Sequence, residues 1–129
     1  MSITSVQTCH APAAIGPYSQ AIVSEPFVFV SGQLGLIPES GELVGPDITA
    51  QATQALENLR QILLASGANI DRVVSVDVYL TDIANFSIFN AIYQQFFRDH
   101  RPARAVIEVR SLPKNACIEI KCIAIIRTS

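Results

Sequence analysis

The order of the expected elements predicts an α+β fold, in which two helices pack on one face of a mixed six-stranded sheet. Three observations support this prediction. The N-terminal third contains three strand-like segments, two helical patterns follow with an alternating strand between them, and two further strand-like segments end the chain. No repeat, low-complexity tract or linker divides the 129 residues, so we expect a single domain over residues 1–129.

The N-terminal third has the composition of strands separated by turns. Strands are expected at Ile3–Thr8, Tyr18–Val23 and Phe27–Leu34, with a hairpin turn at Glu25-Pro26 and a second turn at Pro38–Gly41.

The first helix is predicted from about Ile48 to Ala65. Asp47 is a suitable N-cap and Gly67 a suitable residue just beyond the C-cap. Apolar residues at steps of three and four define one face of this helix: Ile48, Ala52, Ala55, Leu56, Leu59, Ile62 and Leu63.

The central strand is expected at Val73–Leu80, where residue types alternate with a period of two. Val74, Val76, Val78 and Leu80 form one set, and Val73, Ser75, Asp77 and Tyr79 form the other. A second helix, from roughly Ile83 to Arg98 with Asp82 as its cap, ends before Pro102. Its apolar stripe contains Phe86, Phe89, Ile92 or Tyr93, and Phe96.

The last two strands are expected at Ala103–Val109 and Cys117–Ile126, joined by a turn at residues 112–115 as neighbours in a hairpin. The second of them is apolar on both faces, since Ile123 and Ile125 oppose an inward set of Ile118, Ile120, Cys122, Ala124 and Ile126. A strand apolar on both sides is usually covered on both. Because two helices cover one face only, another subunit is expected to cover the other.

Composition excludes several classes of protein. Charged residues are 16% of the chain, below the usual 25% or so, and the net charge is −2 without a basic cluster. Nucleic-acid binding is therefore not expected, nor is a membrane span, because no apolar run approaches about 18 residues. The N-terminus lacks a secretory signal, and three cysteines are an odd number, which favours free thiols in the reducing cytoplasm.

The histidines and cysteines do not form a metal-binding pattern. Cys9 and His10 are adjacent and point to opposite sides in an extended segment, and Cys117 and Cys122 face opposite ways on one strand. No CxxC, HExxH, GxSxG or phosphate-loop motif is present. Neither a metal nor a cofactor is expected.

The C-terminal strands carry the most informative polar residues. Alternation places Arg104, Val106 and Glu108 on one face, and parity allows Arg104 and Glu119 to meet on one side of the sheet. An arginine there is a suitable clamp for a carboxylate, and a nearby carboxylate can orient a water. From spacing alone, a structural ion pair between Arg104 and Glu119 is the alternative and is favoured.

Three further positions are candidates for binding. Tyr18 follows a Gly-Pro turn and can wall a pocket, and Ser31-Gly32 ends a strand where backbone can approach a ligand closely. Asn90 lies at the polar edge of the second helix. The alternatives are an ordinary turn, a bulge and a solvated amide.

Four motifs occur together in these segments: Ala11-Pro-Ala-Ala-Ile-Gly-Pro-Tyr-Ser-Gln20, Val30-Ser-Gly-Gln33, Pro102-Ala-Arg104 with Glu108-Val109, and Leu112-Pro-Lys114 leading to Ile118-Glu-Ile120. In this order and spacing the chain resembles the Rid (reactive intermediate deaminase, or YjgF) family over nearly its whole length. The resemblance implies a chorismate-mutase-like homotrimer with sites between subunits. It also implies hydrolysis of 2-imino acids such as 2-iminobutanoate and 2-iminopropanoate, formed by pyridoxal-phosphate-dependent dehydratases, to 2-oxo acids and ammonia.

The resemblance also assigns roles to residues. Arg104 would clamp the substrate carboxylate with help from the backbone N–H of Val106, and Glu119 would orient the attacking water. The pocket would be lined by Tyr18, Ser31, Gly32 and Asn90, and no cofactor is implied. The chain departs from the closest members at Val106, where they carry cysteine, and at Lys121, where they carry an acid.

Two other functions compete with deamination. One is a non-enzymatic module that binds a small carboxylate and signals its level. The other is RNA cleavage, which the acidic charge balance disfavours.

Overall fold

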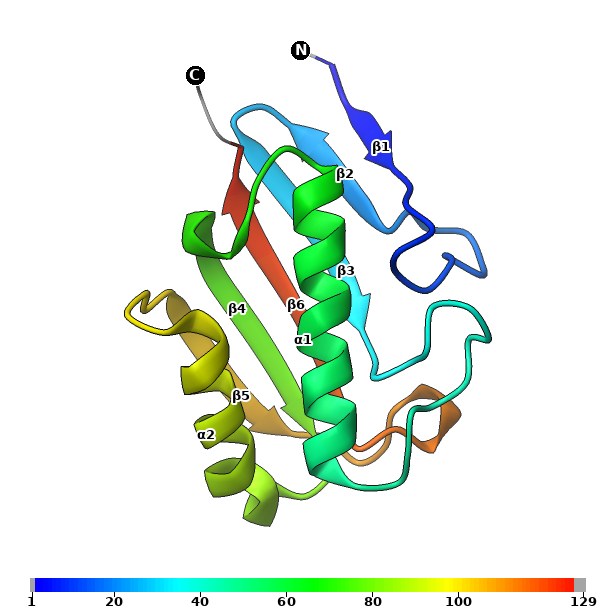
Figure 1. Cartoon of the computed structure of the whole chain (residues 1–129), viewed down its shortest axis with the longest axis vertical. Coiled ribbons are helices and arrows are strands. Elements are labelled where there is room, and N and C mark those ends of the chain that lie inside the picture. Colours follow the sequence, from blue (N-terminus) through cyan, green and yellow to red (C-terminus); the bar gives the residue numbers. More distant parts are fainter. Residues whose placement is uncertain (1, 127–129) are drawn as a thin grey trace.

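A computed structural model describes residues 2–126 as one six-stranded mixed sheet with two helices on one of its faces, which confirms the predicted fold class (Figure 1). Met1 and residues 127–129 of the predicted domain lie outside the described part. The strands are β1 Thr4–Val6, β2 Ala21–Ser24, β3 Phe27–Gln33, β4 Val73–Leu80, β5 Ala103–Glu108 and β6 Ile118–Ile125. The helices are α1 Ile48–Ala65 and α2 Phe86–Phe97, with short 3₁₀ helices η1 Ile70–Arg72, η2 Ile83–Asn85 and η3 Pro113–Asn115.

The strand order is β1-β2-β3-β6-β4-β5. The first three strands form an antiparallel meander, β6 is antiparallel to both β3 and β4, and β5 is parallel to β4 at the edge. The prediction that β5 and β6 are neighbours in a hairpin is wrong, because β4 lies between them. The crossover through α2 returns the chain parallel to β4, and β6 then occupies the central position, where it is paired on both sides.

Helix α1 has the predicted bounds and ends. The Asp47 carboxylate accepts a hydrogen bond from the Ala50 N–H at 3.0 Å, and Gly67 follows the Ser66 C-cap with a φ of +88°. Such a φ is strained for residues with a Cβ atom, so glycine ends the helix here.

The second helical segment differs from the single helix predicted over Ile83–Arg98. The Asp82 carboxylate accepts a hydrogen bond from Ala84 N and caps η2, and α2 begins only at Phe86. The buried stripe of α2 is Phe89, Tyr93 and Phe97, and the partly buried side chains beside it are Phe86, Ile92 and Phe96.

Strand β4 has the predicted bounds, but its first residues are turned the other way. Val73 is 1% exposed and Val74 is 42% exposed, although alternation groups Val74 with the buried Val76. The pairing of β4 with β6 shifts register between Val73 and Ser75, and this irregularity reverses the side-chain parity at the start of the strand.

The sheet has one covered and one open face. The covered face packs against α1 and α2 and includes the buried Ile118, Ile120, Cys122 and Ala124 of β6, as predicted. We call the side opposite the helices the open face; Phe27 and Phe29 lie on it, each 44% exposed, with Ile107 also exposed. Among the described residues, no helix is long and apolar enough to cross a membrane.

Candidate active site

Glu119 and Gly32 are in direct contact on neighbouring strands. Glu119 is paired with Tyr79 of β4, so its side chain lies on the open face, opposite to Ile118 and Ile120. On its other side, β3 shifts register between Val30 and Gln33, next to Gly32. A Cβ atom built on Gly32 would meet the Glu119 carboxylate and lie 2.8 Å from its Cδ. The absence of a side chain at Gly32 therefore makes room for the Glu119 carboxylate.

A hollow of about 560 Å³ opens beside Glu119. Its wall is largely apolar and includes Ile15, Leu34 and Leu36, with Tyr18 and Gly32 also on its lining. A small organic substrate with an apolar side chain fits such a lining.

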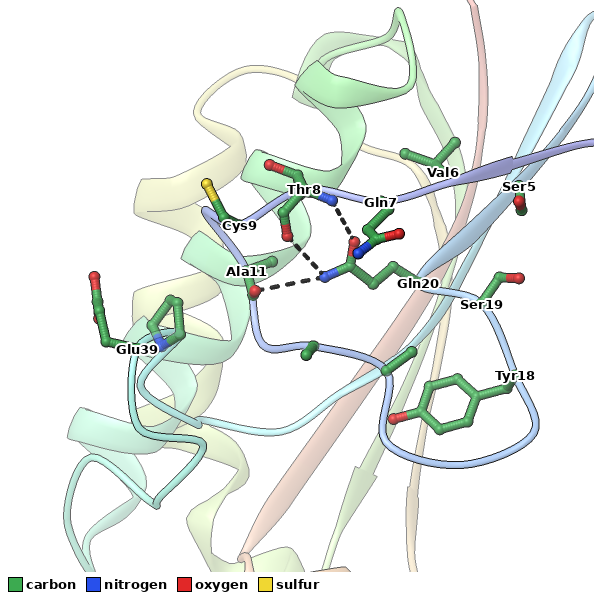
Figure 2. Close-up of a pocket in the computed structure, with 13 residues that line it drawn as sticks. Ser5, Val6, Gln7, Thr8, Cys9, Ala11, Tyr18, Ser19, Gln20 and Glu39 are labelled. Atoms are coloured by element: carbon green, nitrogen blue, oxygen red, sulfur yellow. Dashed lines mark hydrogen bonds between the residues drawn. The ribbon is translucent and has the colours of Figure 1, made fainter.

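The loop that carries Tyr18 is held by side-chain hydrogen bonds. The Gln20 amide donates to the carbonyl oxygens of Thr8 and Ala11 and accepts from the Thr8 N–H at 2.7 Å (Figure 2). It also donates to the Pro12 carbonyl at 2.8 Å. The Ser31 hydroxyl donates to the Ser19 carbonyl at 2.5 Å. Tyr18 therefore projects from an anchored loop, and it lies between the Glu119 hollow and a second hollow of about 640 Å³.

Ser31 is placed differently from Gly32. It lines a separate hollow of about 310 Å³ on the open face, together with Asp77 and Lys121. Its hydroxyl is used to hold the Tyr18 loop, so within one chain Ser31 positions the site rather than lining the Glu119 hollow.

Two effects act on the acidity of Glu119. Burial raises the pKa of its carboxyl group, and the positive charge of Lys121 lowers it by a smaller amount, so the pKa stays above the ordinary value. A carboxylate with a raised pKa is a stronger proton acceptor than an exposed one.

Arg104 lies on the covered face, at the edge beside α2. Its Nη1 donates to Asn90 Oδ1 at 2.7 Å, and its Cζ lies 4.6 Å from the ring centre of Tyr93 and 5.6 Å from that of Phe86. These contacts fix the plane of the guanidinium, and they show that Asn90 is not merely a solvated amide. Val106, two residues on, points to the same face and packs partly against the core.

Arg104 and Glu119 do not meet within one chain: the shared side of the sheet that parity allows is not the arrangement found, because they lie on opposite faces. Arg104 is paired with the buried Val76, whereas Glu119 is paired with Tyr79, whose side chain points the other way. Strand β4 separates them as well. The structural ion pair is excluded for the same reason, and a site using both residues must combine two copies of the chain.

Buried amides on α1 support the Glu119 hollow, and sequence reasoning missed them. Gln51 donates to the Gly45 carbonyl at 2.8 Å and accepts from the Cys117 N–H at 2.8 Å. Asn58 donates to the carbonyl oxygens of Leu34 and Leu36 and accepts from the Gln54 amide. Both residues fall three or four positions from members of the apolar stripe, and that spacing is the signal that could have revealed them.

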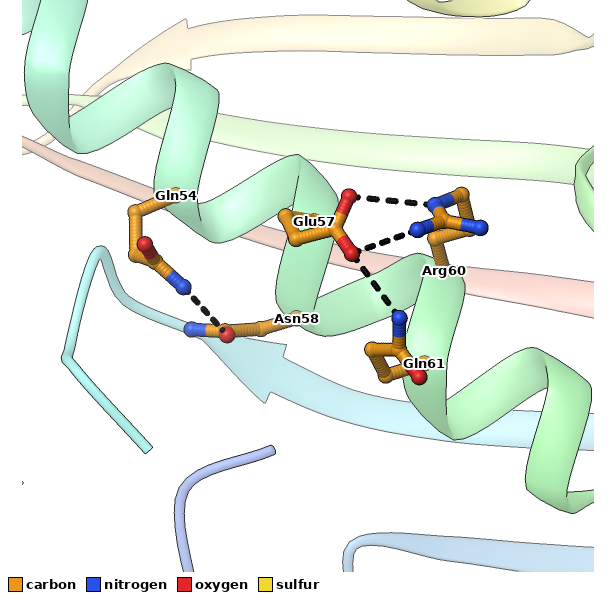
Figure 3. A network of polar contacts seen from close by, with 5 residues as sticks. All are labelled: Gln54, Glu57, Asn58, Arg60 and Gln61. Carbon is orange, nitrogen blue, oxygen red and sulfur yellow. Dashed lines mark hydrogen bonds and ion pairs between the residues drawn. The ribbon is translucent and has the colours of Figure 1, made fainter. Parts of the chain in front are cut away.

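Figure 3 shows Asn58 beside the outer charges of α1. Asn58 and Gln54 are bonded to one another, while Glu57 pairs with Arg60 at 2.6 Å and accepts from Gln61. The outer pair is partly exposed and contributes little to stability. The buried amides fix the loop over residues 34–45 that walls the hollow.

The cysteines are free, as expected: Cys9 is exposed, Cys117 half-buried and Cys122 buried. Residues 2–126 contain no group of three metal-binding side chains. The ring of His100 lies 2.6 Å from the Val73 carbonyl oxygen.

Comparison with known proteins identifies the class to which this fold belongs. The family described as Endoribonuclease L-PSP matches residues 8–126. A human protein named 2-iminobutanoate/2-iminopropanoate deaminase is 45% identical over 120 residues, which are 93% of this chain and 88% of the human one. The chloroplastic Reactive Intermediate Deaminase A of Arabidopsis thaliana is 50% identical over 119 residues, which are 92% of this chain and 64% of that protein.

Solved structures of related proteins have the same fold as this chain. RidA from the Antarctic bacterium Psychrobacter sp. has a TM-score of 0.92 and 41% identity, covering 95% of this chain and 99% of its own. E. coli TdcF, solved with bound serine, has a TM-score of 0.91 and 37% identity, covering 97% and 99%. The chain therefore belongs to the endoribonuclease L-PSP family, also known as the Rid or YjgF family.

Proposed function

We propose that the protein is a hydrolytic deaminase that converts 2-imino acids, such as 2-iminobutanoate and 2-iminopropanoate, into 2-oxo acids and ammonia. The observation that carries this proposal is the oriented Arg104 guanidinium, which lines an open hollow and pairs with no carboxylate among residues 2–126. Relatives 45–50% identical to the chain carry deaminase names, which supports the same activity here.

Arg104 is suited to hold the substrate carboxylate. The amide of Asn90 occupies one edge of the guanidinium and the Tyr93 ring supports its face, so the remaining N–H groups can bind a carboxylate with both oxygens. The backbone N–H of Val106 adds a donor on the same strand. Asn90 and Tyr93 thus restrict the orientation of the bound substrate through the guanidinium that they fix.

Glu119 is suited to orient the attacking water and accept its proton. Water oxygen adds to the imine carbon while Glu119 accepts the proton that the water loses. Glu119 returns this proton to the imine nitrogen, which gives a carbinolamine. The carbinolamine hydroxyl then passes its proton by way of Glu119 to the nitrogen, the C–N bond breaks as the C=O bond forms, and 2-oxo acid and ammonia are released. An imine is already electrophilic, so orientation of the two reactants supplies most of what is needed. Tyr18 and Gly32 shape the hollow in which this occurs.

The complete site is proposed to form between subunits of a homotrimer. Arg104, Asn90 and Val106 come from one chain, and Tyr18, Gly32 and Glu119 come from its neighbour, since one chain keeps the two groups on opposite faces. The exposed Phe27, Phe29 and Ile107 of the open face supply apolar surface for the contact. Ser31 would then face the interior of the assembly.

The three free thiols fit a reducing compartment, and we place the protein in the cytoplasm. Its substrates would come from pyridoxal-phosphate-dependent dehydratases, which release enamines that tautomerise to 2-imino acids. A net charge of −2 without a basic cluster disfavours RNA as the substrate.

A coupled assay tests the proposed activity. A threonine or serine dehydratase generates the imine, and the added protein is expected to shorten its lifetime. Arg104→Ala and Glu119→Gln are each expected to reduce kcat/KM by about 100-fold or more, because one holds the substrate and the other activates the water. Arg110→Ala is the control: it removes an exposed arginine that lines neither the hollow beside Arg104 nor the hollow beside Glu119. An unchanged imine lifetime with the wild-type protein would contradict the proposal.

Binding of a small carboxylate without turnover is a second candidate function. It is favoured by the structure of E. coli TdcF with bound serine, a relative of the same fold. In that case small 2-oxo acids would raise the Tm of the wild-type protein and of Glu119→Gln equally, and neither would accelerate imine loss.

A further inference from the structure

We propose that Arg101 is a specificity-determining residue that binds a second carboxylate, and that the enzyme prefers 2-imino dicarboxylates of four or five carbons. The inference rests on the proposed deaminase activity and adds a substrate class to it. Its basis is a hollow that contains two arginines and no acidic side chain.

The hollow beside α2 has a volume of about 460 Å³ and is lined by Asn90, Tyr93, Gln94, Arg101, Pro102 and Arg104. Arg104 is the proposed clamp for the carboxylate next to the imine. Arg101 brings a second guanidinium to the lining of the same space, and Gln94 adds an amide to it. Two cations lining one cavity without a carboxylate favour an anionic ligand with two charged groups.

Arg101 is held in place by backbone rather than by an acid. Its Nη1 donates to the carbonyl oxygens of Arg98 and His100 at the C-terminal end of α2, where Arg98 has a φ of +59°. Pro102 follows and restricts the backbone. Arg101 also lines the adjoining hollow, together with Arg98 and Asp99, but it forms no ion pair with Asp99 among the described residues.

The two arginines line the same hollow, and Tyr93 is part of that lining. Burial raises the pKa of Tyr93 to about 12, and the charges of Arg104 and Arg101 both oppose this rise. The Arg104 guanidinium stacks on the Tyr93 ring at 4.6 Å. Tyr93 thus supports the Arg104 guanidinium in the hollow that Arg101 also lines.

The reaction itself is unchanged. A 2-imino dicarboxylate and one water give a 2-oxo dicarboxylate and ammonia, with the C–N bond broken and the C–O bond formed as for the smaller imines. Arg104 holds the carboxylate beside the imine carbon, and Arg101 holds the one at the far end. A monocarboxylic imine uses Arg104 alone.

The test compares two substrates across matched variants. Glutamate and 2-aminobutanoate are each oxidised by an amino-acid oxidase to their imines, and kcat/KM for hydrolysis is measured for both. Arg101→Gln is expected to reduce the ratio of the glutamate-derived to the butanoate-derived value about tenfold, and Arg101→Lys to restore part of it. Arg98→Gln removes the same charge from the neighbouring position outside the hollow and serves as control. Calorimetry with 2-oxoglutarate and 2-oxobutanoate measures the same preference without turnover.

The outcomes separate this inference from the proposed function. If the wild-type protein hydrolyses neither imine, the deaminase proposal fails. If it hydrolyses both and Arg101→Gln leaves their ratio and the 2-oxoglutarate affinity unchanged, the second clamp is overturned and the deaminase stands. If Arg101→Gln lowers both activities equally together with the Tm, Arg101 only caps α2, and the inference is overturned as well.

Discussion

The pH response of the candidate active site depends on two residues of one strand, Glu119 and Lys121. Burial raises the pKa of Glu119 and Lys121 lowers it by less. If the ionised form of Glu119 accepts the water proton, activity is present above its pKa and is lost as the pH falls through it. Replacing Lys121 by Met removes the opposing charge, so the pKa rises further, and the acid limb of kcat/KM is expected to move to higher pH.

Lys121→Arg is the matched control, because it keeps the charge and should leave the acid limb where the wild-type protein has it. Titration of the imine is common to all variants, so a difference between them reports on the protein. An acid limb at the same pH in Lys121→Met and wild type would show that Glu119 is not the group that titrates.

At the scale of elements, two glycines near the end of β3 have different neighbours. A Cβ atom on Gly32 would meet the flexible side chain of Glu119, whereas one on Gly35 would lie 2.6 Å from the backbone of Gln51 in α1. Gly32→Ala is therefore expected to displace the carboxylate and reduce kcat/KM by about 100-fold, with the fold retained. Gly35→Ala is expected to destabilise the fold by about 1–3 kcal/mol, because a helix must move.

Thermal unfolding and imine hydrolysis, measured on both variants, separate the two effects. Gly32→Ala should keep a Tm near that of the wild-type protein, and Gly35→Ala should not. Full activity in Gly32→Ala would argue against a fixed position for Glu119.

The elements themselves could be largely predicted from the sequence, but their neighbours could not. The bounds of α1 and β4 were predicted to the residue, since periodicity and caps are local signals. Alternation also placed Arg104 and Val106 on one face of β5 correctly. Alternation carries no information on which strand lies alongside, so the predicted pairing of β6 with β5 is wrong. A register shift such as that at Val73 changes the parity without a sequence signal.

In the candidate site, too, local features could be predicted from the sequence and contacts between distant elements could not. Its residue types were recognisable, but the contact of Asn90 with Arg104 and the position of Ser31 depend on packing between elements far apart in the chain. The apolar pattern of α1 does not indicate the polar Gln51 and Asn58, because such a stripe is defined by its hydrophobic members. Their buried hydrogen bonds exist only once the loop over residues 34–45 has folded against α1.

At the scale of the whole molecule, the open face and the divided site have a common explanation. One chain exposes Phe27 and Phe29 on the side of the sheet that the helices leave uncovered. The same chain keeps Arg104 and Glu119 on opposite faces, with β4 between them. Association of three chains head to tail would bury the exposed apolar side chains of the open face. It would also bring Arg104 of one chain to Glu119 of the next, because each contact joins two different surfaces.

Subunit mixing tests this arrangement. Arg104→Ala and Glu119→Gln are each expected to be inactive alone. When equal amounts are unfolded together and refolded, a site between subunits is intact if its arginine comes from one variant and its glutamate from the other, so about one quarter of the wild-type activity is expected for random mixing in a closed ring. If each site lay within a single chain, no mixture would recover activity. Mixing either variant with itself is the control, and light scattering must show the same trimer mass in every sample, because a monomer that recovers activity would refute the shared site.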